Sequence, residues 1–545
     1  MKRFLWLGLI VLLAAVLRFY QLGTIAPSLT WDEAAWGYNA YSLGIDGRDE
    51  YGKFMPVDYF ESFGDYKPPV YAYLDILPVK VFGLTEFAVR FPSALFGTLT
   101  VLVTYFLVQR IFSVHESKKT KIRDYTEWIA LVSAGLLAIS PWHILLSRGA
   151  FEANVATFLL ATGVWLFLEA VQRKKYLLIL SAVSFVLAFY TFNSARIVGP
   201  ILLVGLAIGF WRQLLQMKKA VVLSAVIGIA LLLPILPFLL SPQSKVRFQE
   251  VNIFSDLTVL ERSNQEIVND GNAPLSKIIH NRRLAYGTEY LDHYFDNLSF
   301  DFLFIHGDDN PKFSVNSMGQ LYLFELPFLI AGILFLFRKR TGAWWIVPFW
   351  LLAAIVPAAA ARETPHALRI EGALPMFQIL VAYGFVSIFR LLPRLRLLAM
   401  TIVALVALCN VVYFVEDYFT HYATQYSKEW QYGYKEALAY MQQEEGKYSK
   451  IYFTGELGRP YIYTLFYTKY DPASFRANAT IEHEGLGFTN VHQFGKYYFK
   501  KELLVKTGEK NVLYFAIPSE VPAKAQVHKK FYSLDGKEAL VAYTL

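Results

Sequence analysis

Two adjacent carboxylates, Asp32 and Glu33, follow the first long apolar stretch of the chain. A carboxylate in such a place can act as a general base, because it can take the proton of a hydroxyl group that attacks an electrophilic carbon. The positive charges of Lys67 and Arg196 can bind an anionic group and stabilise the charge that develops on a departing phosphate. These residue types therefore suit the transfer of a chemical group from a phosphate carrier to a hydroxyl.

Further polar and charged residues concentrate in the short connections between apolar stretches. These connections cover residues 31–34, 65–69, 147–154, 193–196 and 362–371. They contain the additional candidates Asp65, Arg148, Glu152, Asn154, His366 and Arg369. Carboxylates and cations gathered at one membrane face could bind an anionic head group whose apolar tail stays in the bilayer.

Each motif also has a purely structural alternative. Asp32 and Glu33 could form the N-cap pair of an interfacial helix over residues 34–43. Arg148 and Glu152 have the spacing of an ion pair on one helix. The sequence Lys67-Pro68-Pro69 could be a rigid turn that leads into the next hydrophobic segment.

The other basic and metal-binding side chains have structural alternatives as well. Arg196 could extend to the lipid head groups, and His366 could cap or pack near the end of an apolar stretch. His306, Asp308 and Asp309 suggest a metal site, although adjacent acids in a glycine-containing turn are usually solvated. We therefore assign no metal ligand and no definite cofactor, and a divalent metal remains an alternative.

The composition predicts an integral membrane protein. Hydrophobic residues make up 55% of the 545 residues, charged residues only 18%, and the mean hydropathy is +0.35. Soluble domains carry about 25% charged residues, so the composition disfavours a purely soluble protein and excludes a disordered one. The single cysteine, Cys409, excludes a disulfide scaffold and a cysteine-based zinc cluster.

Membrane spans need roughly 20 apolar residues each, and about eleven stretches of the chain qualify. They are residues 4–22, 88–112, 128–140, 153–171, 176–192, 197–211, 220–240, 321–337, 343–361, 373–389 and 397–415. The stretch at 4–22 follows Lys2 and Arg3 and has no small-residue cleavage site, so it is expected to stay as an anchor.

The distribution of basic residues predicts the orientation of these spans. With the N-terminus in the cytoplasm, alternate loops should be basic, and clusters indeed fall at residues 118–123, 173–175, 212–219, 338–340 and 390–396. An odd number of spans then puts the C-terminal segment on the extracytoplasmic side. The net charge of +8 is thus explained by topology, and nucleic acid is not expected as a partner.

Two domains are expected from this pattern. Residues 1–415 form a mostly α-helical membrane domain with outer loops at about 23–87 and 241–320, and residues 416–545 form a small α/β domain outside. Within the latter, residues 434–443 predict a helix, 460–467 have helical character, and 450–454, 511–517 and 539–543 predict strands. The large outer loop and the final domain are expected to shape the acceptor site.

Several short motifs occur in a specific order along residues 1–415. They are the acidic pair Asp32-Glu33, Lys67-Pro68-Pro69, Ala-Val-Arg-Phe-Pro-Ser at 88–93, and later blocks at 147–154, 192–196 and 365–369, the last leading to Pro375. Together they resemble glycosyltransferase family 39, the group of protein O-mannosyltransferases and lipid A aminoarabinose transferases. The later blocks are similar to those of bacterial members, which implies a bacterial plasma membrane.

The resemblance implies an inverting membrane glycosyltransferase with the GT-C fold and about eleven spans. The donor would be a sugar on a polyprenyl-phosphate carrier, and the acceptor would approach from the outer face. Asp32 would be the general base, and Glu33 would orient the acceptor or a cation. The donor phosphate would be held by Lys67, Arg196, Arg369 and His366, supported by Arg148, Glu152, Asn154 and Asp65.

The chain departs from the family pattern in three places that limit the prediction. One is the stretch Arg369-Ile370-Glu371, which lacks the aromatic residue that often follows the arginine. Tyr66 precedes Lys67, where the aminoarabinose transferases carry an acid, so no metal is carried over from that branch. Residues 416–545 do not resemble the repeat domain of eukaryotic mannosyltransferases, so the acceptor stays open among protein, lipid and glycan. The alternative class is a transporter or flippase of lipid-linked sugars, which should place charges near the bilayer midplane and show internal repeats.

Overall fold

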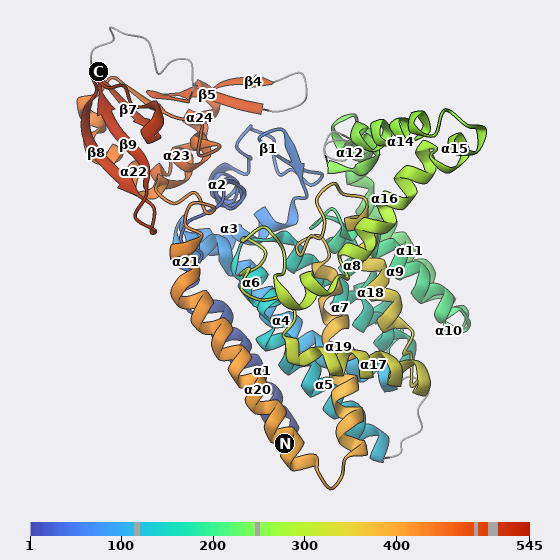
Figure 1. Cartoon of the computed structure of the whole chain (residues 1–545). Helices are drawn as coiled ribbons and strands as arrows, with labels where there is room; N and C mark the ends of the chain where they lie inside the picture. Colours follow the sequence, from blue (N-terminus) through green and yellow to red (C-terminus); the bar gives the residue numbers. More distant parts are fainter. Residues whose placement is uncertain (1, 114–119, 246–250, 484–488, 500–510) are drawn as a thin grey trace. The chain divides into compact units, whose positions relative to one another are not determined.

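The computed structural model describes residues 2–113, 120–245, 251–483, 489–499 and 511–545, and these are mostly helical (Figure 1). The chain divides into two compact units. The first consists of Met1–Arg18, Leu95–Ser147 and Glu152–Phe414, and the second of Phe19–Ala94, Arg148–Phe151 and Val415–Leu545. The second unit thus joins most of the first outer segment to residues 415–545, and the division into domains at 1–415 and 416–545 stays a prediction.

The first unit is helical. Its helices, of which some continue into the second unit, are α1 (Lys2–Phe19), α4 (Glu86–Ser113), α5 (Thr120–Ile139), α6 (Pro141–Arg148), α7 (Glu152–Gln172), α8 (Leu177–Phe189), α9 (Ala195–Gly209), α10 (Trp211–Leu215), α11 (Lys218–Leu232), α12 (Leu236–Leu240), α14 (Leu257–Asn269), α15 (Pro274–Ile279), α16 (Arg282–Asp296), α17 (Leu326–Lys339), α18 (Ile346–Ala359), α19 (Leu374–Leu391) and α20 (Arg396–Glu416). Short 3-10 or π turns lie at Leu233–Ile235, Ile253–Ser255, Asp301–Ile305, Leu323–Glu325 and Glu371–Ala373.

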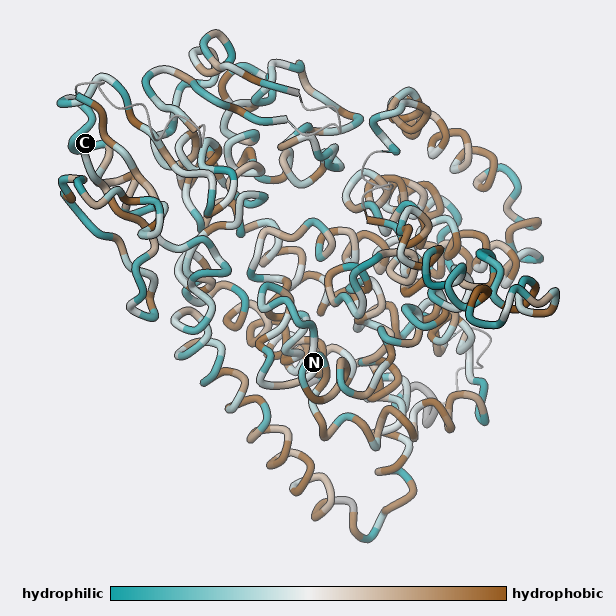
Figure 2. The backbone as a smooth tube through the Cα atoms, turned by 45° about the horizontal axis from the view of Figure 1, so that its top comes forward, coloured by the Kyte–Doolittle hydropathy of each residue, from teal (hydrophilic) through white to brown (hydrophobic). Residues whose placement is uncertain are grey.

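Hydrophobic residues run along much of these helices (Figure 2). Five segments of the described chain are long and apolar enough to cross a membrane: Glu86–Ser113, Glu152–Gln172, Lys218–Leu240, Glu371–Leu391 and Leu397–Gln425. The pair Asp124–Ile139 and Pro141–Arg148, bent by 55°, would be a sixth. Helices such as α8 and α9, with 13 and 15 residues, fall short of the roughly 20 that a crossing needs. The protein is therefore an integral membrane protein in which five or six of the described segments could cross the membrane, and the count of eleven remains a prediction.

Arg18 stabilises the bend between α5 and α6. The carbonyl groups at the end of a helix lack partners in the helix itself. The buried guanidinium of Arg18 donates to the carbonyl oxygens of Leu137 and Ala138 at the end of α5, at 3.2 and 3.1 Å. It also donates to Ser147 Oγ in α6 and lies 2.7 Å from a ring nitrogen of His143. Arg18 is thus a structural residue that joins α1 to both halves of the bent pair.

The second unit combines short helices with two sheets. Its elements are α2 (Trp31–Asp46), β1 (Phe60–Ser62), β2 (Asp65–Lys67), α3 (Val70–Phe82), α21 (Tyr422–Gln425), α22 (Tyr434–Glu444), β3 (Lys450–Phe453), α23 (Pro460–Thr468), α24 (Pro472–Asn478), β4 (Thr480–His483), β5 (Thr489–Phe494), β6 (Tyr497–Tyr498), β7 (Val512–Ala516), β8 (Gln526–Tyr532) and β9 (Glu538–Thr544). Short turns lie at Asp417–His421, Glu445–Lys447 and Pro518–Glu520. The expected C-terminal helices and strands all form, with bounds that differ by one or two residues.

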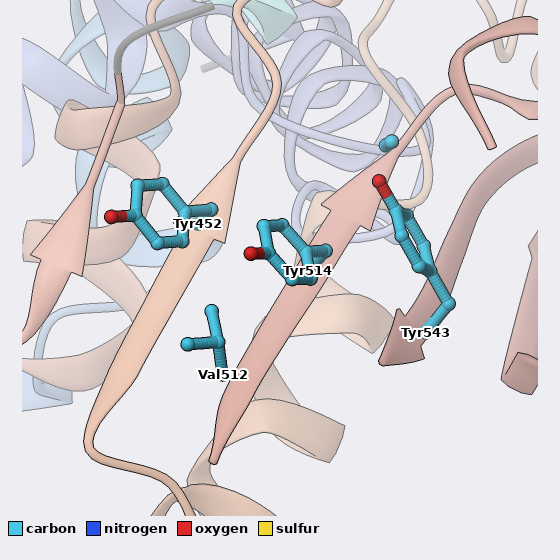
Figure 3. Packing of buried hydrophobic residues seen from close by; sticks show 5 residues of the cluster. Tyr452, Val512, Tyr514 and Tyr543 are labelled. Carbon is cyan, nitrogen blue, oxygen red and sulfur yellow. The ribbon is translucent and has the colours of Figure 1, made fainter. Parts of the chain in front are cut away.

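The larger sheet has seven strands in the order β4-β5-β6-β3-β7-β9-β8. The central strand β3 pairs in parallel with both β6 and β7, and the other pairs are antiparallel. On one face, Tyr452, Tyr514 and Tyr543 from β3, β7 and β9 stack with ring centroids 5.3 and 5.2 Å apart (Figure 3). Such cross-strand aromatic pairs stabilise a sheet and fix its register.

Helix α2 is fixed at its start by a capping box. Thr30 Oγ1 accepts a hydrogen bond from Glu33 N, and Glu33 Oε2 accepts one from Thr30 N. These bonds satisfy donors that the first turn of a helix leaves free. The helix then packs beside α23 (Figure 1), where Gly37 leaves room for the ring of Phe466 and the Tyr463 hydroxyl donates to Leu29 O. The C-terminal segment thereby supports the helix that carries the acidic pair.

Candidate active site

Asp32 and Lys67 meet at the surface of the second unit. Asp32 lies in the first turn of α2, and Lys67 ends β2, which is the second strand of a tight hairpin with Phe63 and Gly64 at positive φ. Lys67 Nζ forms an ion pair with Asp32 Oδ1. The Lys67 side chain is only 7% exposed, whereas the Asp32 side chain is 52% exposed. The carboxylate therefore covers a buried cation and remains accessible to a substrate from outside.

Aromatic rings surround the Lys67 ammonium group. Its Nζ lies 5.2 Å from the Trp36 ring centroid and 5.3 Å from that of Phe63. Cations at such distances are attracted by the negative face of a ring. The rings keep the positive charge in place while they exclude water from one side of it, so that its field acts strongly on a nearby anion.

Glu33 has entirely different surroundings from its neighbour Asp32. Its side chain and that of Arg90 are fully buried and form an ion pair, with Arg90 Nε 2.9 Å from Glu33 Oε1. Glu33 also accepts hydrogen bonds from the backbone N–H groups of Thr30 and Ala150. Arg90 in turn donates to the carbonyl oxygens of Leu22, Ala26 and Ser28. Glu33 thus holds α2, α4 and the turn around residue 150 together.

Arg148 and Asp65 occupy structural positions in the same unit. The buried Arg148 donates to the Tyr418 hydroxyl at 3.1 Å and to the carbonyl oxygens of Gln21 and Ile25, and it lies over the Phe419 ring. Asp65 opens β2 opposite Ser62, at the turn end of the hairpin, while Lys67 stands at its open end. The hairpin therefore directs Lys67 toward Asp32 and leaves Asp65 away from this pair.

Arg196 lies in the first unit, at the start of α9. Its Nε donates to the carbonyl oxygen of Phe189, and its guanidinium lies over the rings of Phe189 and Phe238, at 5.6 and 6.0 Å. Its Nη2 is buried and has no hydrogen-bond partner among the described residues. A buried donor without a partner is costly, and an anionic ligand would satisfy it.

A turn at residues 363–369 presents His366 and Arg369. Backbone N–H groups of His366 and Ala367 donate to Asn297 Oδ1 and Asp308 Oδ2, at 3.0 and 2.7 Å. Arg369 donates to Glu363 at its carbonyl oxygen and its carboxylate, the latter at 3.3 Å. Burial and the charge of Arg369 lower the pKa of His366 to about 3. His366 is therefore neutral, and it can form a hydrogen bond with a phosphate but cannot supply a positive charge.

The remaining supporting residues belong to the first unit. Glu152 begins α7, and Asn154 Oδ1 in the same helix accepts from Ser147 Oγ at 3.5 Å. Within the described ranges, no group of three or more His, Cys, Asp and Glu side chains is arranged to hold a metal. Asp308, a member of the expected acidic turn, instead accepts hydrogen bonds from Ala367 N and Asn310 N.

The structure also places beside the candidate residues several side chains that the sequence analysis did not identify as candidates. Glu50 is fully buried behind Lys67, where its Oε1 accepts from Ser62 Oγ, and burial raises its pKa to about 8. Arg90 is the partner of Glu33, and Trp36 and Phe63 flank Lys67. An arginine at the start of an apolar stretch was a visible signal for Arg90, whereas nothing local in the sequence distinguished Glu50 from other loop acids.

Comparison with known proteins supports the resemblance. Residues 66–238 match the model of the dolichyl-phosphate-mannose-protein mannosyltransferase family. An uncharacterised protein of Aquifex aeolicus is 30% identical over 203 residues, which are 37% of this chain and 36% of that protein. YkcB of Bacillus subtilis, a candidate mannosyltransferase, is 25% identical over 177 residues, which are 32% of this chain and 22% of that protein. The matched regions thus span about a third or less of these relatives.

The fold matches over nearly the whole chain. The crystal structure of ArnT from Cupriavidus metallidurans in the apo state superimposes with a TM-score of 0.59 at 14% identity, covering 99% of this chain and 98% of ArnT. ArnT bound to undecaprenyl phosphate gives a TM-score of 0.56, and an Archaeoglobus fulgidus oligosaccharyltransferase gives 0.52 at 12% identity over 85% of this chain and 63% of that protein. The chain thus contains, in residues 66–238, the pattern of the dolichyl-phosphate-mannose-protein mannosyltransferase family within the fold of ArnT, which confirms the resemblance to family 39 and its GT-C fold.

Proposed function

We propose that the protein is a glycosyltransferase that moves a sugar from a polyprenyl-phosphate carrier to an acceptor hydroxyl. The observation that carries this proposal is the pairing of a half-exposed carboxylate, Asp32, with a buried ammonium group, Lys67. A transferase of this kind needs a base for the incoming hydroxyl and a cation for the departing phosphate. Asp32 and Lys67 supply one of each, in contact with each other.

In the proposed reaction Asp32 takes the proton of the acceptor hydroxyl. The hydroxyl oxygen attacks the anomeric carbon, a new glycosidic bond forms, and the bond from that carbon to the phosphate oxygen breaks. The electron pair of the broken bond stays on the phosphate, whose negative charge Lys67 would stabilise. A phosphate-binding role of Arg196 and Arg369 stays a prediction from the resemblance. Attack from the side opposite the phosphate inverts the configuration at the anomeric carbon.

The other expected site residues support these groups. Glu33 acts as a positioning residue, because its capping box and its bonds to Arg90 and Ala150 fix the first turn of α2, where Asp32 lies. His366 is neutral and could give one hydrogen bond to a phosphate, and its part in donor binding stays a prediction from the resemblance.

The relatives support the class of donor. ArnT has been crystallised with undecaprenyl phosphate, and the matched family model is named for dolichyl-phosphate-mannose as donor. Both names describe a polyprenyl carrier with one phosphate. We place the reaction at the extracytoplasmic face of a bacterial plasma membrane, with the N-terminus in the cytoplasm, since the basic clusters alternate as this orientation requires. The acceptor is a protein, lipid or glycan hydroxyl.

The test is sugar transfer by the purified protein in lipid vesicles. A panel of labelled polyprenyl-phosphate sugars is offered with total membrane extract as the source of acceptor. We expect one donor to be used by the wild type, and Asp32→Asn to lower the transfer rate by roughly 10²- to 10⁴-fold. Lys67→Met should lower it as well, because the phosphate loses a cation.

A matched control is available in the same outer segment. Asp58 forms an ion pair with Lys53 at 2.6 Å, and both side chains are partly exposed. Asp58→Asn makes the same chemical change away from α2 and should leave the transfer rate unchanged. If Asp32→Asn transfers as fast as Asp58→Asn, the base is another residue. If labelled carrier crosses the bilayer and no sugar is transferred, the protein is a flippase.

A further inference from the structure

The loop between β3 and α23 occupies the part of the C-terminal sheet where ligands usually bind. Residues 454–459 form this loop at the carboxyl end of β3, and β3 is flanked on both sides by parallel strands. In sheets of this type, ligands bind beyond the carboxyl ends of the parallel strands. The loop at residues 454–459 is therefore placed where it could contact a ligand.

The loop faces the start of α2, beside the candidate base. Gly458 has a φ of +82°, and a Cβ at this position would lie 2.9 Å from the ring of Trp31, the residue that precedes Asp32. Glycine is therefore required both by the backbone conformation and by the close approach of Trp31. The Tyr434 hydroxyl donates to the Gly458 carbonyl oxygen and fixes the loop from the other side.

The next residue, Arg459, shares an aromatic ring with Lys67. Its guanidinium carbon lies 5.1 Å from the Phe63 ring centroid, and Lys67 Nζ lies 5.3 Å from the same centroid. The two cations are thus separated by no more than the sum of these distances, about 10 Å. An anion bound near both side chains would be attracted by both positive charges.

Arg459 has most of its donors available for a ligand. One hydrogen bond, from Nη1 to Asn490 Oδ1 at 3.1 Å, orients the guanidinium, which carries five N–H donors in all. Within the described ranges, Arg459 forms no ion pair with an acid. Its φ of +45° lies in the left-handed region, which is uncommon for a residue other than glycine.

We propose that Arg459 of the C-terminal region binds a substrate oxyanion beside Lys67, and so belongs to the same site. This inference rests on the proposed function. The oxyanion is either the phosphate of the polyprenyl carrier or an acidic group of the acceptor, and Arg459 would bind both through the same paired N–H donors. The C-terminal region then contributes to substrate recognition and does not only support α2.

The experiment measures binding of two probes to the full-length protein in nanodiscs. The first probe is undecaprenyl phosphate, and the second is methyl glucuronide, a soluble sugar with a carboxylate. We expect Arg459→Gln to weaken one of them by roughly 10- to 100-fold, with Arg459→Lys in between because it keeps the charge but loses the paired donors. The control is Arg262→Gln, which changes an exposed arginine paired with Glu289 on α14 and α16.

The outcomes distinguish the two possible sources of the anion. They also distinguish a failure of the Arg459 inference from a failure of the proposed function. Weaker undecaprenyl phosphate binding identifies the carrier phosphate, and weaker glucuronide binding identifies an acidic acceptor. If Arg459→Gln binds both probes like the wild type while Lys67→Gln binds undecaprenyl phosphate weakly, the inference is wrong and the proposed function stands. If Lys67→Gln also has no effect, the proposed site itself is wrong and Arg459 has no role in it.

Discussion

Asp32 and Glu33 are chemically alike but face different surroundings in the fold. Consecutive residues of a helix point about 100° apart, so one carboxylate turns outward over Lys67 while the other turns inward to Arg90. The inward carboxylate is neutralised by a buried guanidinium and backbone N–H groups. The two acids can therefore take separate roles, one toward substrate and one toward the scaffold.

Removing the inward carboxylate should destabilise the protein. Glu33→Gln leaves the Arg90 charge buried without a counterion, which costs about 3–5 kcal/mol, whereas the double variant Glu33→Gln with Arg90→Met should recover part of this loss. Thermal and denaturant unfolding in detergent measures the free energy of unfolding of the single and the double variant. Lys53→Met, which breaks the partly exposed pair with Asp58, should cost at most about 1 kcal/mol. Equal losses for the two single variants would contradict the structural role of Glu33.

Glu50 should make the stability depend on pH. Burial raises the pKa of Glu50 to about 8 in the folded protein, from about 4.3 in an unfolded chain. Between these values the folded state binds the proton and the unfolded state does not, so stability falls as pH rises through this window. Glu50→Gln stays neutral and should become more stable than the wild type, by up to a few kcal/mol near pH 8, since each pH unit contributes about 1.4 kcal/mol.

Unfolding of the wild type and Glu50→Gln at several pH values between 5 and 8 checks this expectation. The control is Glu429→Gln, which changes an exposed carboxylate of the same unit and should leave the pH profile unaltered. Parallel profiles for all three proteins would show that Glu50 is already ionised at neutral pH in the folded state.

At the residue scale, the sequence identified the types of residue but not their environments. The acidic pair and Lys67 were identifiable because they stand in a polar connection after an apolar stretch. The sequence did not show which of the two acids faces outward, because this depends on the capping box and on Arg90, which is 57 positions away from Glu33. Arg459 could not be identified as a candidate from the sequence either, because its position beside Phe63 depends on packing between segments about 400 residues apart.

At the scale of elements, α17 and α19 pack with their backbones in close contact. A Cβ on Gly332 would collide with the carbonyl oxygen of Leu380, and one on Gly384 would collide with that of Phe328. Small residues allow membrane helices to approach in this way and gain van der Waals contacts. The obstacles are backbone atoms, which cannot move aside as a flexible side chain can.

Gly332→Ala should therefore destabilise the first unit although alanine favours a helix. We expect a loss at the upper end of the 1–3 kcal/mol range for overpacking, seen as a lower thermal midpoint in detergent. A Cβ added to Gly8 in α1 would meet no heavy atom within 4 Å, so Gly8→Ala should be neutral or slightly stabilising. A pair of variants with equal midpoints would mean that α17 and α19 separate easily.

The sequence predicted the C-terminal strands better than the membrane helices. Strands β3, β7 and β9 are short hydrophobic runs between polar residues, and their pattern is local. By contrast, the apolar stretches 176–192 and 197–211 correspond to helices of only 13 and 15 residues, and apolar character alone does not say where such a helix begins and ends. Strand β8 was not predicted, since most of its residues are exposed at the sheet edge.

At the scale of the whole molecule, the second unit is assembled from distant parts of the chain. Phe19–Ala94 and Val415–Leu545 form one unit. In it, Tyr463 of α23 donates to Leu29 O just before α2, and Phe466 packs against Gly37 of α2. Arg476 forms an ion pair with Asp46. No sequence pattern connects these parts, so a boundary at residue 415 was the natural expectation. The helix that bears Asp32 and the C-terminal sheet stabilise each other.

Residues 416–545 alone should accordingly fail to form a stable domain. Without residues 19–94, the buried side chains of α23 lose their partners and become exposed to water. We expect the fragment to unfold without a sharp thermal transition in near-ultraviolet circular dichroism, whereas a fusion of residues 23–87 to it through a flexible linker should show one. A fragment that melts as cooperatively as the fusion would establish an independent domain.

The separation of these parts has a consequence for biosynthesis. A ribosome that adds 5–20 residues per second needs roughly 20 to 90 s to proceed from Asp32 to Arg459, which lie about 430 positions apart. Throughout that interval the nascent chain already carries its acid and its lysine but lacks the segment that packs against α2. Under the proposed function, a chain interrupted during translation would be inserted in the bilayer without the segment that completes its site, so that only finished copies would use the carrier lipid.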